Sequence, residues 1–270
     1  MPIDRRRFLG LSLAGAAGTR VNAPWLIHGA PSPATPATFP RQDQDSVDEI
    51  VLVAHFDLAR VKKLVEARPA LAKAAIDWGF GDWEDALGAA SHTGRLDIAE
   101  VLLAHGARPT IYSAAMMGQL DTVKAFVSAE PGCQRILGPH GLTLQHHARA
   151  GGARAAATLA FLQELGDADV SPTRLPMDEK GRAMYVGAFA FGDAPEDVLQ
   201  VTADATGGGL SIKGPGIKFA HRINYLGNDE FSPTGAESVR IRFGVVGESA
   251  TSLSVVDAGV VVTATRQQTR

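Results

Sequence analysis

The sequence contains one cysteine, Cys133, among 270 residues. A single thiol excludes an intrachain disulfide framework and a metal site built from several cysteines. Aromatic residues are also few, at 6%. The hydrophobic cores must therefore be built mainly from Ala, Val, Leu and Ile.

Long apolar runs and clustered positive charge are also missing. No run of about 18 apolar residues occurs, so we expect no stable membrane span. The formal net charge is −3, and no basic block follows the first residues. We expect no nucleic-acid partner, because binding to phosphates needs clustered Lys and Arg.

Familiar catalytic motifs are absent too. The sequence has no Gly-x-Ser-x-Gly or Ser-x-x-Lys nucleophile motif and no Gly-x-x-x-x-Gly-Lys-Ser/Thr phosphate loop. The glycines at 214 and 216 lie between predicted strands, with no helix after them to bind a phosphate. The sequence therefore predicts a non-enzymatic chain without a cofactor.

The first residues resemble an export signal. Residues 4–10 (Asp-Arg-Arg-Arg-Phe-Leu-Gly) match the twin-arginine pattern, and a short apolar stretch follows them. The resemblance implies a signal peptide over 1–30 and a periplasmic or secreted protein. Whether and where the signal is cleaved stays open. Residues 31–46, with four prolines, are predicted to form an extended linker.

Residues 47–168 have apolar positions at helical spacing. The clearest unit has Leu87, Ala90 and Gly94 in a first helix and turn, and a second helix that ends at Gly106-Ala107. This unit resembles an ankyrin repeat, and about four such units, mostly degenerate, fit the region. The small Ala90 allows close helix packing, and Gly94 and Gly106 supply turn conformations that other side chains disfavour. The resemblance implies a short α-solenoid whose concave face binds a protein partner.

A change of apolar period from 3.6 to 2 marks a second domain at 178–268, after a linker at 169–177. Seven or eight short strands with one apolar face predict an antiparallel β-barrel or sandwich. The fold class is therefore α+β and multidomain. Strands are expected to include one that begins near Tyr185 and one at 217–219. The stretches 185–192, 228–231 and 239–243 resemble small β-domains appended to bacterial exported proteins.

Three histidines, His140, His146 and His147, are the best candidates for metal ligands. Adjacent residues on a helix point about 100° apart, so His146 and His147 cannot easily face one ion. We therefore predict no metal site. His92 and His105 are expected at the surface, and Cys133 is expected in a loop without a catalytic role.

The loop at 78–83 is unusually aromatic for this chain. Its Trp78, Phe80 and Trp83 either anchor a protein partner or seal the gap between the first two repeats. On the inner helices, His92, Met116 and Met117 are expected to be exposed and to add to a binding surface.

The leading hypothesis is an exported, non-enzymatic scaffold that binds an unidentified protein partner through its helical repeats. One alternative is small-molecule binding inside the β-domain, since a barrel of eight strands can hold one small ligand. It depends on whether Phe189, Phe191, Ile241 and Phe243 fill the interior. An unrecognised hydrolase is the other alternative, and the oligomeric state stays open.

Overall fold

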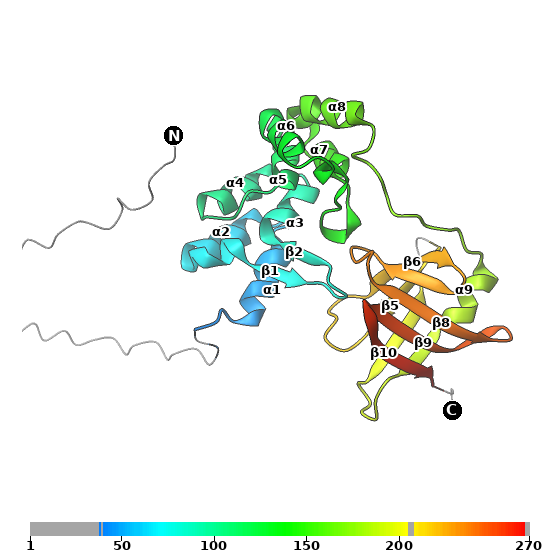
Figure 1. The fold of residues 1–270 in the computed structure, drawn as a ribbon. Helices are drawn as coiled ribbons and strands as arrows, with labels where there is room; N and C mark the ends of the chain where they lie inside the picture. The colour runs from blue at the N-terminus through cyan, green and yellow to red at the C-terminus, as the bar shows by residue number, and fades with distance from the viewer. Residues whose placement is uncertain (1–37, 39, 205–207, 268–270) are drawn as a thin grey trace, which may run out of the picture. The chain divides into compact units, whose positions relative to one another are not determined.

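Apart from one short hairpin among the helices, helices precede strands along the chain (Figure 1). The computed structural model describes residue 38 and residues 40–204 and 208–267. The predicted signal peptide at 1–30 and half of the predicted linker at 31–46 (residues 31–37 and 39) lie outside the described residues. No helix of the described segments is long and apolar enough to cross a bilayer.

Eight helices between residues 44 and 165 form four consecutive pairs. The first helices of the pairs contact one another in the order α1, α3, α5, α7, while α2 contacts α4 and α6 contacts α8. The helices therefore form a stack (Figure 1). Their bounds are α1 Gln44–Val53, α2 Leu58–Ala67, α3 Ala86–His92, α4 Leu96–Ala104, α5 Ile111–Met116, α6 Leu120–Ala129, α7 Leu144–Ala150 and α8 Ala156–Leu165. Short 3₁₀ helices lie between some of them: η1 Pro69–Lys73, η2 Cys133–Arg135, η3 Pro139–Gly141 and η4 Gly152–Ala155.

Polar side chains fix where these helices begin. The carboxylates of Asp57 and Asp85 accept hydrogen bonds from backbone amides in the first turns of α2 and α3, and Thr110 and Thr143 do the same for α5 and α7. Each bond satisfies an amide that has no partner within its helix.

Apolar residues at helical spacing form the core of the stack. Leu87, Ala90 and Leu102 are all buried, as the sequence predicts. Gly94 and Gly106 have φ values of +72° and +89°, which confirms their expected turn conformations. The structure begins its first helix at residue 44, three residues before the predicted boundary of the helical region.

A β-hairpin separates the first two helix pairs. Its strands, β1 (Ala75–Asp77) and β2 (Trp83–Asp85), are antiparallel, with Asp77 opposite Trp83. The aromatic loop of the sequence therefore includes the hairpin tip. Glu84 lies in the middle of β2 and is buried.

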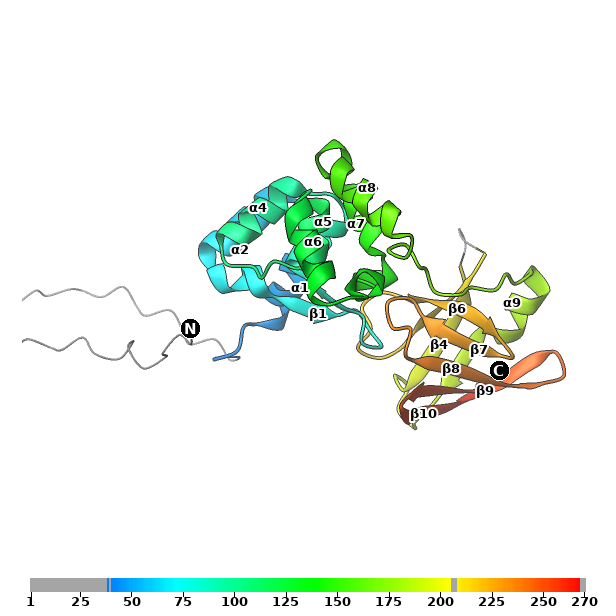
Figure 2. The same cartoon turned by 45° about the horizontal axis from the view of Figure 1, so that its top comes forward.

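Eight strands after residue 186 form a closed antiparallel barrel in the order β10-β3-β4-β5-β6-β7-β8-β9. This confirms the predicted barrel and rejects the sandwich. Figure 2 shows the strands curling around a common interior. Their bounds are β3 Gly187–Ala190, β4 Val198–Ala203, β5 Leu210–Lys213, β6 His221–Gly227, β7 Glu230–Pro233, β8 Arg240–Val246, β9 Ser249–Asp257 and β10 Gly259–Arg266.

The barrel interior is filled by side chains. Phe189, Ile241 and Phe243 are buried in one cluster, and Phe191 packs against it. Two local predictions in this region are wrong. Tyr185 ends a helix, α9 (Glu179–Tyr185), and does not begin a strand; Asp178 caps that helix. Residues 217–219 form no strand.

Candidate metal centre

Four side chains from separate elements of the helical region converge on one point. His55 follows α1, Glu84 lies in β2, His92 ends α3, and His140 lies in η3. One ligand atom of each lies within 4.8 Å of the others. Glu84 and His92 are eight positions apart, and every other pair is 29 to 85 positions apart along the chain. The stacking of the helices therefore brings them together.

The distances suit a shared ion. His92 Nε2 lies 2.9 Å from Glu84 Oε1, while His140 Nε2 and His55 Nε2 lie 3.3 and 3.5 Å from Glu84 Oε2. Ligands bound about 2.0–2.2 Å from a metal ion lie about 3.0–4.4 Å from one another, depending on the bond angle. The four groups therefore need little movement to ligate one ion.

Hydrogen bonds orient two of the imidazole rings toward the centre. His55 Nδ1 donates to the carbonyl oxygens of Val51 and Leu52, at 3.1 and 3.0 Å. His140 Nδ1 lies 2.7 Å from Asp82 Oδ2. When either ring is neutral, these bonds favour the proton on Nδ1, which leaves the Nε2 lone pair on the side of Glu84. Metal-binding histidines are typically held in this way by a carbonyl or a carboxylate.

Asp82 holds His140 in an unusual backbone conformation. His140 has φ +59° and ψ +23°, in the left-handed region, and its amide donates to Asp82 Oδ1 at 2.8 Å. Non-glycine residues in this region are uncommon and often lie at functional sites. The same Oδ2 atom also lies 3.4 Å from Nε2 of His221, which belongs to the barrel. A Cβ atom at Gly235 would lie 2.4 Å from the Asp82 carboxylate, so only glycine allows this approach.

Two buried polar atoms in the centre have only each other as a close polar neighbour. Trp78 Nε1 donates to Glu84 Oε2 at 2.8 Å. Glu84 Oε1 and His92 Nε2 have no hydrogen-bond partner, although they lie close together. Buried polar atoms are rarely left without partners, because desolvation without a bond costs about 1–3 kcal/mol. A bound cation would satisfy both atoms at once.

The charges of the centre are strongly coupled. Burial raises the pKa of Glu84, but its interaction with His140 outweighs this effect and lowers the pKa to about 2. Burial lowers the pKa of His140, but the carboxylates of Asp82 and Glu84 outweigh it and raise the pKa to about 10. Without an ion, a proton on His140 therefore offsets one of the two carboxylate charges. A bound metal ion would take the place of that proton, since ligation requires the neutral ring.

The donor set indicates the kind of ion. Three imidazoles and one carboxylate suit a divalent first-row transition ion such as Zn²⁺, Fe²⁺, Mn²⁺ or Co²⁺, whereas Mg²⁺ and Ca²⁺ prefer oxygen ligands. Zn²⁺ would be saturated by four ligands. A six-coordinate ion would keep two further positions.

A cleft of about 490 Å³ lies beside the centre. His55 and His140 line it, whereas Glu84 and His92 do not. Aromatic residues Phe56, Trp78 and Phe219 contribute to its walls.

The residues predicted to bind a partner lie in different environments. Trp78 packs against the helical core and bonds to Glu84. Phe80, with φ +60°, packs against the barrel core. Trp83 is 63% exposed. The aromatic loop is thus partly structural and partly open to solvent.

The predicted exposure of two inner-helix residues is wrong. Met116 is buried in the helical core, because α5 packs against both α3 and α7. The His92 side chain is 12% exposed, because it points to Glu84. Met117 is half-buried.

Among the described residues, His146, His147 and Cys133 do not join the centre. Buried His147 lies 2.8 Å from Ser91 Oγ, and burial lowers its pKa to about 3. His146 Nε2 donates to the carbonyl oxygen of His92 at 3.2 Å. Cys133 is buried, and burial raises its pKa. The sequence analysis compared His140 with His146 and His147, of which only His140 lies in the centre. The four residues of the centre follow no fixed spacing, so no sequence motif indicates them.

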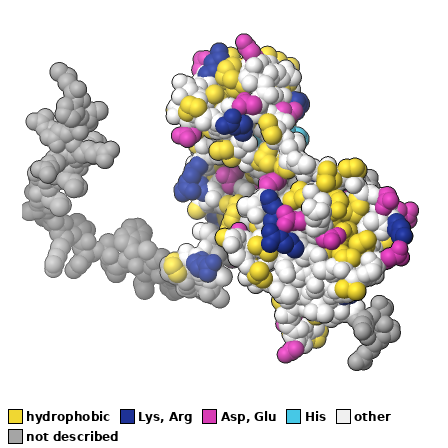
Figure 3. Space-filling model, turned by 45° about the vertical axis from the view of Figure 1, so that its right-hand side comes forward, with side chains coloured by type: hydrophobic (Ala, Val, Ile, Leu, Met, Phe, Trp, Pro, Cys, Tyr) yellow, Lys and Arg dark blue, Asp and Glu magenta, His cyan; other side chains and the backbone are white. Residues whose placement is uncertain are grey.

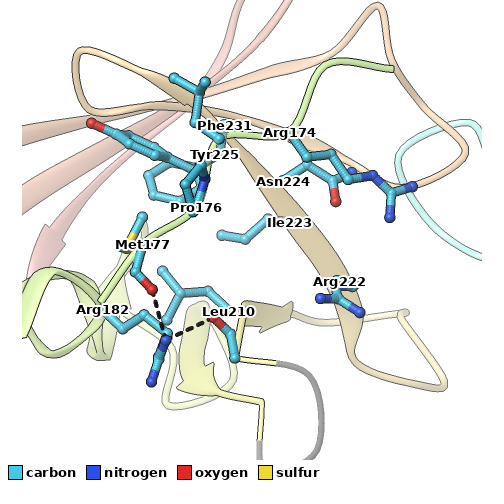
Figure 4. Close-up of a pocket in the computed structure, with 13 residues that line it drawn as sticks. Arg174, Pro176, Met177, Arg182, Leu210, Arg222, Ile223, Asn224, Tyr225 and Phe231 are labelled. Atoms are coloured by element: carbon cyan, nitrogen blue, oxygen red, sulfur yellow. Dashed lines mark hydrogen bonds between the residues drawn. The ribbon is translucent and has the colours of Figure 1, made fainter. Parts of the chain in front are cut away.

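A second cavity, of about 270 Å³, lies at one end of the barrel beside α9 (Figure 4). Arg174, Arg182 and Arg222 line it. The Arg182 guanidinium is already used: its Nη1 donates to the carbonyl oxygens of Met177 and Gly208, at 2.9 and 2.8 Å. This arrangement holds the segment before α9 to the barrel.

On the face drawn in Figure 3, basic and acidic side chains are interspersed and little histidine surface is visible. No protein-family model, curated protein or solved structure matches the chain.

Proposed function

We propose that this protein binds one divalent first-row transition-metal ion through His55, Glu84, His92 and His140. The observation that carries the proposal is the buried pair of Glu84 Oε1 and His92 Nε2, which have no other partner. The orientation of the His55 and His140 rings by Nδ1 hydrogen bonds supports it further. This assignment replaces the expectation that the chain has no metal site.

Metal content tests the proposal directly. The purified full chain is loaded with Zn²⁺, Co²⁺ or Mn²⁺ in turn, desalted, and analysed by mass spectrometry for bound metal. We expect about one equivalent of at least one ion in the wild type. Glu84→Gln and His92→Ala should each lower the affinity at least about 100-fold, because each removes a ligand.

His105→Ala is the matched control. His105 follows a helix, as His55 does, and its Nδ1 lies 2.8 Å from the carbonyl oxygen of Val101, but it lies outside the centre. This variant should bind metal like the wild type. Equal metal content in wild type and Glu84→Gln would overturn the proposal, and circular dichroism would verify that each variant is folded.

We further propose that the helical region is a short ankyrin-type stack. Four consecutive helix pairs, a hairpin between the first two pairs, and left-handed glycines at the turns support it. Such a stack suits the predicted role as a scaffold for a protein partner. Trp83 is the predicted contact with the most exposed side chain, so Trp83→Ala should lose any partner that the wild type captures.

Export by the twin-arginine route stays a proposal that depends on residues 4–10. That the chain is not an enzyme likewise stays a prediction.

A further inference from the structure

The cleft beside the metal centre has the size and composition of a small-molecule site. Its volume of about 490 Å³ lies within the range of about 300–1,000 Å³ that is typical of such sites. Its walls are mostly apolar and include Leu52, Phe56, Trp78 and Phe219. Polar side chains also line it, among them His55, Asp82 and His140.

The aromatic walls are unusually open to solvent. Phe56 is 60% exposed and Phe219 is 48% exposed, although the chain has few aromatic residues. The ring centroids of Phe219 and Trp78 lie 5.5 Å apart, and Trp78 also packs against His140 at 5.7 Å. The aromatic surface therefore continues from solvent to a metal ligand. Clustered exposed rings of this kind mark a surface that a ligand covers.

The part of the cleft wall formed by His55 and His140 indicates which group of a ligand would lie beside the metal centre. His55 and His140 face both the cleft and the metal centre. A six-coordinate ion held by four protein ligands has two positions left, and the cleft is the side on which its ligands meet open space. Three neutral imidazoles, the Glu84 carboxylate and a divalent ion carry a net charge of +1. Asp82 and Arg222 also line the cleft and their opposite charges cancel, so the remaining charge of +1 favours one anionic oxygen donor.

We propose that the cleft binds a small aromatic carboxylate, with its carboxylate on the metal ion and its ring against Phe56, Trp78 and Phe219. This inference rests on the proposed metal site. The carboxylate completes the coordination of the ion, and the ring is removed from water by the aromatic walls.

The test uses the full chain loaded with Co²⁺, whose visible absorption changes when its ligands change. Benzoate, acetate and benzamide are titrated separately. Benzoate should alter the Co²⁺ spectrum and bind about 10- to 100-fold more tightly than acetate, because it also buries a ring. Benzamide keeps the ring but lacks the charge, and should bind at least about 10-fold more weakly than benzoate.

Substitutions in the cleft wall separate the contribution of the ligand's ring to the affinity from the contribution of its bond to the metal ion. Phe219→Ala and Phe56→Ala should each weaken benzoate about 3- to 10-fold and leave acetate and Co²⁺ affinities unchanged. Phe126→Ala is the control, because Phe126 is 42% exposed on α6 and does not line the cleft. It should change none of the three affinities.

The outcomes distinguish the two proposals. If Co²⁺ does not bind, the metal site fails and this inference fails with it. If Co²⁺ binds in the centre but benzoate binds no more tightly than acetate, the ligand assignment alone is overturned. A benzoate affinity that Phe219→Ala and Phe56→Ala both leave unchanged would also overturn it.

Discussion

The Asp82 carboxylate contacts His140 twice: Oδ1 accepts from the backbone amide of His140, and Oδ2 contacts Nδ1 of its ring. It ligates nothing itself. Its role is to hold the His140 ring so that Nε2 is directed at Glu84, in a backbone conformation that His140 would otherwise rarely adopt. A metal site depends on such orienting groups as well as on its ligands.

Asp82→Asn should therefore weaken metal binding about 10- to 100-fold without abolishing it, because an amide oxygen is a weaker, uncharged acceptor for the His140 ring. Competition with a chromophoric chelator would measure the change. Asp169→Asn is the control: Asp169 accepts hydrogen bonds from Thr143 and Arg149 outside the centre. An unchanged affinity in folded Asp82→Asn would show that Asp82 does not orient a ligand.

Single residues show where prediction from sequence stops. The burial of Leu87 and Leu102 follows from helical spacing alone. The burial of Met116 does not, because it depends on which neighbouring helices α5 contacts. The proposed metal ligands are even harder to predict from the sequence. His55 and His140 are 85 positions apart, and only the stacking of helix pairs makes them neighbours. No local pattern contains that information.

At the scale of elements, one of the turns between helices excludes side chains for a reason that the sequence does not indicate. Gly94 and Gly106 both have left-handed backbones. A Cβ atom at Gly94 would lie 2.3 Å from the carbonyl oxygen of Ala150, whereas one at Gly106 would meet nothing within 4 Å. The two glycines therefore separate the cost of backbone conformation from the cost of a steric clash.

Gly106→Ala should lower the free energy of unfolding by about 1 kcal/mol, the cost of a left-handed alanine. Gly94→Ala should lower it by a further 1–3 kcal/mol or so, since the turn must also move away from Ala150. Urea denaturation of both variants would measure the difference. Equal losses would mean that the turn shifts freely, and that the close approach adds nothing to the stability of the stack.

The barrel strands could be predicted from the sequence, except at the start of the domain. Alternation of apolar residues sufficed for the barrel, because residues such as Phe189 and Ile241 all point inward. It failed just before β3, where Tyr185 fits the alternation but belongs to α9. Asp178 caps that helix, and Tyr185 packs on Phe231 from the end of the barrel. The capping bond of Asp178 and the contact between Tyr185 and Phe231 therefore favour a helix where the alternation of apolar residues predicts a strand.

At the scale of the whole molecule, the proposed ion would join four segments of the helical region. It would connect the end of α1, the hairpin, α3 and η3 through one point, and Asp82 extends the connection to His221 of the barrel. Because the ligands are scattered in an unfolded chain, the free energy of metal binding becomes free energy of folding.

Removing the metal should therefore lower the melting temperature. At a free-ion concentration about 100-fold above the dissociation constant, binding stabilises the fold by about 2.7 kcal/mol. For a protein of this size that corresponds to about 5–10 °C. Trp78 and Trp83 lie in the hairpin, so tryptophan fluorescence would follow the helical region during heating, with and without a chelator.

Glu84→Gln provides the internal reference for that measurement, because a chelator should not change its melting temperature. Far-UV circular dichroism of the same samples would also follow the barrel, whose filled interior contains no part of the metal site. A shift in the fluorescence transition that the wild type shows and Glu84→Gln lacks would place the stabilising ion in the helical region. The same shift in both proteins would mean that metal stabilises the chain elsewhere, and the four-residue centre would lose its support.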